Sequence, residues 1–153
     1  MKILVLPMLL LFAVQSASTL RTVPSSLVGQ WKIGKPFYDM TPQPIGLSAE
    51  QEKKLIGKRL DVESTSVSAC GTRIQITSVE STAYSAEGFL EKYRIRPDQI
   101  DLVAPLTNYS FSSRGLTAIC GSPEAFDIIS DGRNAVLENA NDYFHLSKLA
   151  VAR

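Results

Sequence analysis

A single histidine, His145, is present among the 153 residues, so any mechanism that needs an imidazole base must use this side chain. A serine or cysteine hydrolase needs a nucleophile, a base and an orienting group that converge in space. Serines are abundant, but the G-x-S-x-G pattern of a nucleophile elbow is absent. Alternation over 143–146 places His145 on the face of Tyr143, opposite Phe144 and Leu146. We therefore expect a surface or rim histidine, with a catalytic base as the alternative.

The carboxylates offer a second possible chemistry, because an acid and a nucleophile lying close together can hydrolyse a glycosidic bond. The chain has fifteen Asp and Glu residues, and their spacing selects no pair. No P-loop, dinucleotide fingerprint, H-E-x-x-H motif or Asp-rich calcium loop is present in the sequence. One histidine and two cysteines are too few for a histidine-rich metal site or a zinc-finger array. We expect no catalytic residue, no cofactor and no metal.

Three side chains suited to binding, Phe37, Tyr38 and Met40, lie close together in the stretch 34–46. Three prolines in this stretch exclude a helix or a regular strand. The loop is too extended to bury all three side chains, and exposed aromatic side chains on a stiff loop are typical of a binding rim. The alternative is that they fold back as a lid over one open end of a barrel.

Cys70 and Cys120 are the only cysteines, so they form the only possible intramolecular pair in an oxidising compartment. A bond between them closes a loop of about 51 residues. The chain-entropy model predicts that closing a loop of this length stabilises the fold by roughly 4 kcal/mol. No C-x-x-C motif supports a redox role. We expect a structural disulfide, with two free thiols or a redox or intermolecular role as alternatives.

The N-terminus has the pattern of a secretory signal. A short basic n-region, Met1-Lys2, precedes a nearly pure apolar run at 3–14, and a small, polar stretch follows at 15–18. The apolar run is too short to span a bilayer comfortably. We expect residues 1–18 to be a signal peptide cleaved between Ser16 and Thr19, which places the protein outside the cell or in the periplasm with no membrane span; an uncleaved anchor is the alternative.

Composition limits the remaining chain to one soluble domain. The formal net charge of +1 becomes zero when Lys2 leaves with the signal, so no strong field favours nucleic acid or anionic lipid. A hydrophobic content of 44% is too high for a disordered chain. We expect a flexible lead-in at 19–27 and a single mostly-β domain at 28–149. The sequence does not determine its oligomeric state.

Two short helices are expected within this domain. Ser48 and Gln51 form a capping-box pattern for a helix over 49–56, whose charged residues are expected to form a solvated face. Ser85 is the expected N-cap of a second helix that extends to Tyr93.

Apolar residues alternate with polar ones through most of the rest of the chain, which predicts short antiparallel strands. Asp131-Gly132 predicts a type I′ hairpin turn, and 139–142 predicts a second turn. The spacing of these strands favours an antiparallel barrel or sandwich that is mainly β. The expected strands cover 28–33, 59–63, 73–77, 100–102, 109–111, 116–120, 125–129, 134–137 and 143–146.

At Gly29-Gln30-Trp31 the chain resembles the opening of lipocalins and other calycins, in which a G-x-W lies on the first strand. That resemblance implies an eight-stranded barrel with Trp31 closing one end. The overall layout is also similar to small secreted bacterial proteins of unknown activity, a likeness that implies an exported barrel-like domain and no mechanism. Asn108 begins a glycosylation sequon, which matters only in a eukaryotic source.

We therefore expect a non-catalytic binding protein whose ligand-binding residues are Trp31, Phe37, Tyr38 and Met40. The ligand is either a small apolar molecule inside a barrel or a protein partner held at the rim. These two possibilities differ in whether the interior is open or filled. A small secreted hydrolase that uses His145 or a carboxylate pair is the alternative.

Overall fold

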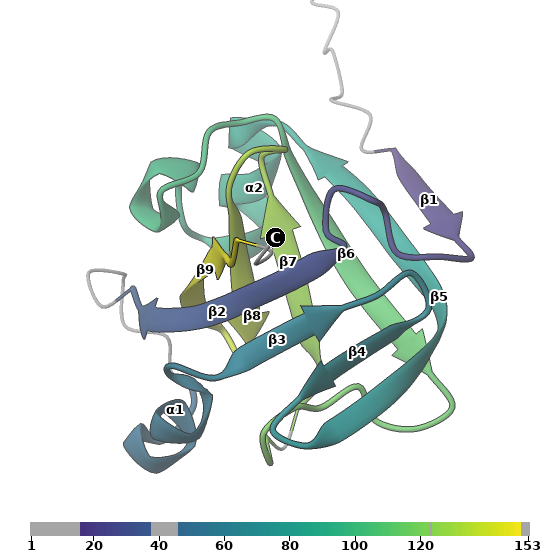
Figure 1. Ribbon diagram of the computed structural model, residues 1–153. Coiled ribbons are helices and arrows are strands. Elements are labelled where there is room, and N and C mark those ends of the chain that lie inside the picture. The colour runs from purple at the N-terminus through teal and green to yellow at the C-terminus, as the bar shows by residue number, and fades with distance from the viewer. Residues whose placement is uncertain (1–15, 38–45, 123, 151–153) are drawn as a thin grey trace, which may run out of the picture.

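The computed structural model describes residues 16–37, 46–122 and 124–150, and shows a closed antiparallel barrel with short helices (Figure 1). The predicted fold class, mainly β with an antiparallel barrel, is confirmed. The strands are β1 (Ala17–Leu20), β2 (Gly29–Pro36), β3 (Arg59–Val62), β4 (Ser66–Ala69), β5 (Thr72–Tyr84), β6 (Leu106–Ser113), β7 (Phe126–Ser130), β8 (Ala135–Asn139) and β9 (Asp142–Lys148). The helices are α1 (Ala49–Leu55), α2 (Ala86–Tyr93) and the 3₁₀ helix η1 (Pro97–Ile100).

Strands β2 to β9 follow one another around the barrel, and β2 pairs with β9 to close it. The long strand β5 makes this possible, because its first residues pair with β4 and its remainder pairs with β6. Strand β1 pairs with the later residues of β5, beyond the part of β5 that pairs with β4. The barrel therefore closes without β1, part of which lies inside the expected signal peptide; residues 1–15 of that segment lie outside the described residues.

Because neighbouring strands are antiparallel and follow chain order, their connections alternate between the two ends of the barrel. We call one end the floor end; it carries the connections β3–β4, β5–β6 and β7–β8. The other end, the mouth end, carries the connections β2–β3, β4–β5, β6–β7 and β8–β9. Helix α1 lies at the mouth end, and α2 and η1 belong to the β5–β6 connection (Figure 1).

The segment before β2 closes the floor end. Val23 and Leu27 are buried in the barrel core, and the Val23 N–H donates to the Ser64 carbonyl across 2.8 Å. The Trp31 indole N–H donates to the Leu27 carbonyl at 2.8 Å. The expected flexible lead-in at 19–27 is thus packed, because its two apolar side chains, separated by turn residues, reach the core.

Apolar side chains from all eight barrel strands fill the interior. Inward-facing residues of β7, β8 and β9 belong to this core, while intervening residues of the same strands point outward. Members with no more than 2% exposure include Ile33, Leu60, Val62, Val67, Val79, Phe126, Ile128, Leu137 and Phe144.

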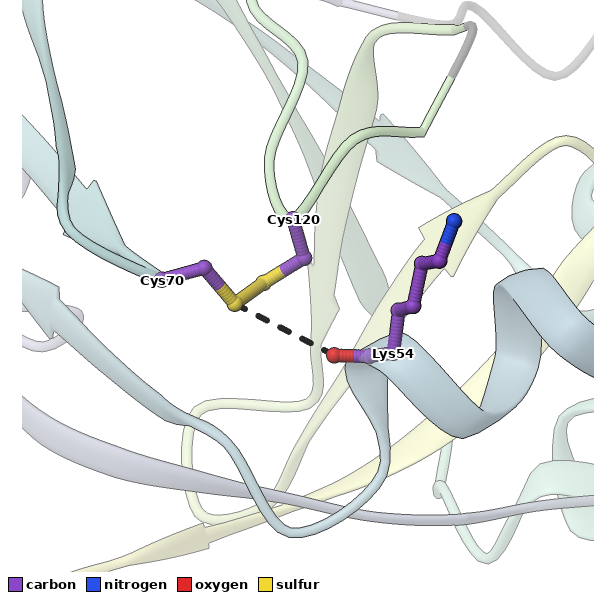
Figure 2. Close-up of a disulfide and its surroundings, with 3 residues drawn as sticks. All are labelled: Lys54, Cys70 and Cys120. Carbon is purple, nitrogen blue, oxygen red and sulfur yellow. Dashed lines mark hydrogen bonds between the residues drawn. A yellow bond between two sulfur atoms is a disulfide. The ribbon is translucent and has the colours of Figure 1, made fainter.

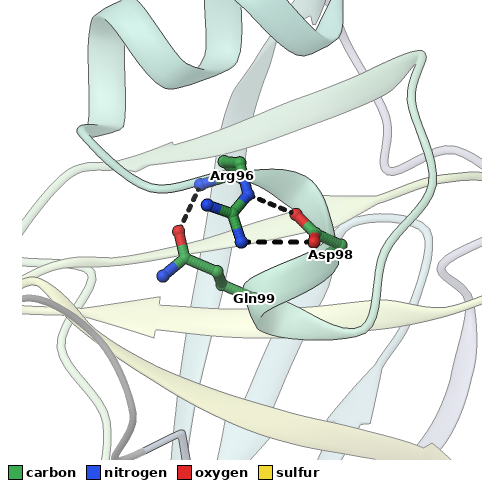
Figure 3. A network of polar contacts seen from close by, with 3 residues as sticks. All are labelled: Arg96, Asp98 and Gln99. Carbon is green, nitrogen blue, oxygen red and sulfur yellow. Dashed lines mark hydrogen bonds and ion pairs between the residues drawn. The ribbon is translucent and has the colours of Figure 1, made fainter.

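A second apolar cluster lies outside the barrel, where α2 and η1 cover β6 to β9. Phe89 and Ile95 are fully buried there against Ile129 and Val136. At the start of η1 the Arg96 N–H donates to the Gln99 side chain at 2.8 Å (Figure 3). The Arg96 guanidinium donates to both carboxylate oxygens of Asp98, and these hydrogen bonds lower the pKa of Asp98.

Both expected helices are confirmed, and so are their caps. Ser48 and Gln51 form the reciprocal capping box of α1, and the Ser85 hydroxyl accepts from the Gly88 N–H at the start of α2.

Three expectations of local structure were wrong. Residues 100–102 are not a strand: Ile100 ends η1, and both apolar side chains of this segment pack in the second cluster. Residues 116–120 belong to the β6–β7 connection without strand structure. The β7–β8 hairpin has a loop of four residues, 131–134, in which the Asp131 carboxylate accepts the Asn134 N–H. Local alternation cannot separate a strand from a loop that buries every second residue.

Candidate functional site

A disulfide between Cys70 and Cys120 connects two loops at the mouth end, with an S–S distance of 2.03 Å and a Cα–Cα distance of 5.1 Å (Figure 2). The predicted pairing is confirmed. Cys70 and Cys120 have φ values of 51° and 54°, and a positive-φ glycine follows each of them. Two left-handed residues in succession give the tight turn of a type I′ hairpin. The disulfide therefore joins two Cys-Gly turns, one between β4 and β5 and one within the β6–β7 connection.

Helix α1 lies against this disulfide and closes the mouth. The Cys70 Sγ lies 3.9 Å from the Lys54 carbonyl oxygen, while the Lys54 side chain extends away from the two sulfur atoms (Figure 2). The next residue, Leu55, is 1% exposed and belongs to the barrel core, as does the fully buried Ile119. Leu55 of the helix and Ile119 of the disulfide-bonded loop thus close the mouth end of the barrel.

An open recess of about 580 Å³ lies between α1 and the disulfide. Its charged residues are three lysines and one glutamate, and its remaining lining comes from the two Cys-Gly turns. The lining residues are Glu50, Lys53, Lys54, Lys58, Cys70, Thr72, Cys120 and Gly121.

Two more recesses adjoin this one. The second, of about 400 Å³, adds Arg59, Asp61 and Arg73, and the third, of about 630 Å³, extends to Arg114 and Leu116. Thr72 lines all three, so they form one continuous surface, which we call the mouth face. Six basic side chains and two acidic ones line it.

Ion pairs neutralise only part of this charge. Arg59 pairs with Asp61 at 2.7 Å, Arg73 pairs with Glu63 at 2.6 Å, and Lys54 lies 3.7 Å from Glu50. Within the described part of the chain, no ion pair joins Lys53, Lys58 or Arg114 to an acid. The mouth face therefore carries excess positive charge on a nearly neutral protein.

This surface is not evident from the sequence, from which the charged residues of 49–56 are expected to form only a solvated face. The run 53–59 does contain four basic side chains in seven positions, and this is the one signal that the sequence offers. Only folding brings Arg73 and Arg114 beside that run.

Within the described residues, buried apolar side chains occupy the barrel interior. Trp31, the predicted floor residue, is 5% exposed and lies in the filled barrel core. Its indole N–H is already bonded to the Leu27 carbonyl, and the Lys148 Nζ lies 5.2 Å from the centre of its ring. Trp31 lines none of the recesses described here, which all open to the outer surface.

Of the predicted rim residues, the structure describes Phe37; Tyr38 and Met40 lie outside the described residues. Phe37 is half-buried against His145, with ring centroids 3.7 Å apart. A Cβ at Gly34 would lie 2.9 Å from the His145 Cβ, so glycine at this position permits the close approach of β2 to β9. Phe37 therefore packs on the barrel wall and forms part of no mouth-face recess.

His145 is a surface residue, one of the two positions predicted for it: it lies in the middle of β9, on the outer wall of the barrel, and its side chain is 45% exposed. Its Nδ1 lies 3.9 Å from Asp101 Oδ2, and both residues line a recess of about 360 Å³ that also contains Ser147. An acid and a hydroxyl-bearing residue are therefore close to the single histidine.

The carboxylates of Asp127 and Glu138 come from residues paired across β7 and β8. Asp127 Oδ2 accepts hydrogen bonds from the Asn108 side-chain amide and from the Ser110 hydroxyl, each at 2.8 Å. Asn108 is only 7% exposed, so the acceptor residue of the sequon is buried within β6 in the folded protein. Neither carboxylate lines any recess described here.

Burial, together with the nearby carboxylates of Asp127, Glu124 and Asp142, raises the pKa of Glu138 to about 7, although the Asn141 N–H that donates to this carboxylate opposes the shift. Burial likewise raises the pKa of Tyr143, which lies close to Glu138.

In the described residues, no group of three or more His, Cys, Asp and Glu side chains is arranged to hold a metal ion. Across those same ranges, no helix has the length and apolar character needed to cross a bilayer. Comparisons with family models, with curated proteins and with solved structures found no significant match.

Proposed function

We propose that this protein is a secreted or periplasmic, lipocalin-like barrel that acts by binding a protein partner at its mouth face, without catalysis. The likeness to lipocalins is one of architecture and of the G-x-W on the first barrel strand. The disulfide supports an oxidising compartment, where such bonds persist.

The filled interior is the observation that carries this proposal. A barrel that holds a small apolar ligand needs an internal cavity lined by several strands. Here Phe126, Phe144 and Leu137 occupy the interior, and residues of the floor and mouth segments cover both ends. Binding at the outer surface is the remaining way in which such a barrel recognises a ligand.

The mouth face is the surface best suited to this role. It combines three adjoining recesses, an excess of positive charge and an exposed apolar side chain, Leu116. The barrel, α1 and the disulfide hold its loops in place, so little conformational entropy is lost when a partner binds.

The test is capture of the partner from the native extract by the full chain and by two bulky, charge-neutral variants. Thr72→Trp fills the point shared by all three recesses, whereas Thr22→Trp places the same side chain at the floor end. We expect the wild type and Thr22→Trp to capture one stoichiometric protein and Thr72→Trp to lose it. Capture that survives Thr72→Trp, or recovery of only a small apolar molecule, would refute the proposal.

Hydrolysis at the His145 recess is the second candidate. Asp101 lies on the Nδ1 side of the imidazole, the side from which a carboxylate orients a catalytic base, and Ser147 lines the same recess. Labelling of Ser147 by a fluorophosphonate that is lost in His145→Ala would support this candidate; absence of labelling in the folded wild type would exclude a serine nucleophile there.

A further inference from the structure

We propose that the mouth face recognises an acidic peptide segment of its partner in which carboxylates flank an apolar side chain. This inference rests on the proposed protein-binding function and specifies the chemistry of the partner.

The unpaired positive charge of the mouth face is spread over more than one recess. Lys53 and Lys58 line the recess beside the disulfide, and Arg114 lines the third recess. All three are exposed, and none has an acidic partner among the described residues. Carboxylates spaced along a bound chain would pair with these cations, and such complementarity governs both partner choice and association rate.

The third recess adds an apolar contact point beside Arg114. Leu116 is 63% exposed and lines the third recess together with the buried Ile74. An apolar side chain bound there would cover Leu116, and desolvated apolar anchors contribute a large part of the binding energy of an interface.

Two features favour a peptide over a polyanion such as a nucleic acid or a sulfated polysaccharide. Asp61 lies among the basic residues of the mouth face and pairs with Arg59, while Glu63, in the adjoining recess outside this face, pairs with Arg73. These carboxylates would repel a continuous row of phosphates or sulfates but leave gaps for a chain with spaced charges. A polyanion also provides no apolar side chain for Leu116.

The probe is a fluorescein-labelled dodecapeptide of the repeat Glu-Glu-Leu, compared with Gln-Gln-Leu and Glu-Glu-Ser repeats of equal length. Fluorescence anisotropy with the full chain measures the affinity for each peptide. We expect only the Glu-Glu-Leu peptide to bind well, and we expect its affinity to fall about tenfold between about 0.05 M and about 0.5 M salt, because screening weakens exposed ion pairs.

Matched variants locate the site. Lys53→Glu with Lys58→Glu should weaken binding at least about tenfold, through loss of attraction and gain of repulsion. Lys92→Glu with Arg133→Glu makes the same charge change on α2 and at the floor end and should leave the affinity unchanged. Leu116→Ser should also weaken binding, whereas Val103→Ser, at a position 73% exposed, should not.

The inference is overturned if the acidic peptide does not bind at low salt, or if both charge variants weaken binding equally. Tighter binding of heparin that does not depend on Leu116 would assign the face to polyanions instead. If the peptide fails while Thr72→Trp still abolishes partner capture, the peptide chemistry is wrong and the protein-binding function stands. If Thr72→Trp leaves capture intact, the proposed function itself fails.

Discussion

At the residue scale, Glu138 is the group whose charge state is most strongly altered by the fold. Its carboxylate is half-buried beside three other acids, and burial raises its pKa to about 7 from a usual 4.5. The folded state therefore holds the proton more tightly than the unfolded chain. Consequently the free energy of unfolding falls as the pH rises from about 4.5 to about 7, and it does not recover above that range.

Replacing Glu138 by glutamine tests this effect. Glu138→Gln removes the ionisation but keeps an oxygen that can accept the Asn141 N–H. We expect it to raise the free energy of unfolding by about 2 kcal/mol at pH 8 and to change it little at pH 4. Urea unfolding at both pH values measures the difference, with Glu91→Gln, an exposed position on α2, as the control. An equal effect at pH 4 and pH 8 would contradict the assigned pKa.

At the scale of elements, the disulfide and α1 act together on the mouth end. The disulfide closes a separation of 50 residues between two turns, and α1 places Leu55 under the same loops. The disulfide and α1 both restrict the conformations of the mouth-end loops, which otherwise have only their short turns to restrain them. They therefore keep the recesses of the mouth face open in one arrangement.

Removing the disulfide should destabilise the fold through the entropy of the unfolded chain. We expect Cys70→Ala with Cys120→Ala to lower the free energy of unfolding by about 4 kcal/mol or somewhat less. Guanidinium unfolding of the double variant, alongside the wild type with and without reductant, measures this. The reduced wild type should match the double variant; a change of less than about 0.5 kcal/mol would mean that the unfolded chain is already restricted.

At the scale of the whole molecule, the inside of the barrel is a packed hydrophobic core and not a ligand-binding cavity. Apolar side chains from all eight barrel strands form one buried cluster inside it, and Leu137 is fully buried among them. Interiors packed in this way leave little space larger than a water molecule.

An engineered cavity provides the test of this packing. Leu137→Ala should lower the free energy of unfolding by about 2–5 kcal/mol and create a dry cavity that binds benzene. The wild type and Val103→Ala, altered at an exposed position, should show neither effect. Saturable benzene binding by the wild type, followed by NMR or calorimetry, would show that a cavity already exists and would favour the small-ligand function.

The positions of both helices could be predicted because their signals are local. Ser48 and Ser85 cap the helices through bonds to N–H groups three residues later, and such bonds depend on nothing distant. The strands at 59–63 and 73–77 were identified because one barrel face is buried and their alternation is strict. By contrast, Ile100 and Leu102 alternate in a non-strand segment because a helix covers the outside of the barrel there.

The mainly β character of the chain and its one possible disulfide follow from the amino-acid sequence, because residue period and cysteine count are properties of the chain. The filling of the barrel follows from the three-dimensional fold, since the volume of an interior depends on how side chains from distant strands pack. The fold also decides where charge gathers: Lys53 and Arg114 are far apart in sequence, and barrel closure places both on one face. The surface that we propose as functional therefore arises from the strand topology, and no local sequence pattern predicts it.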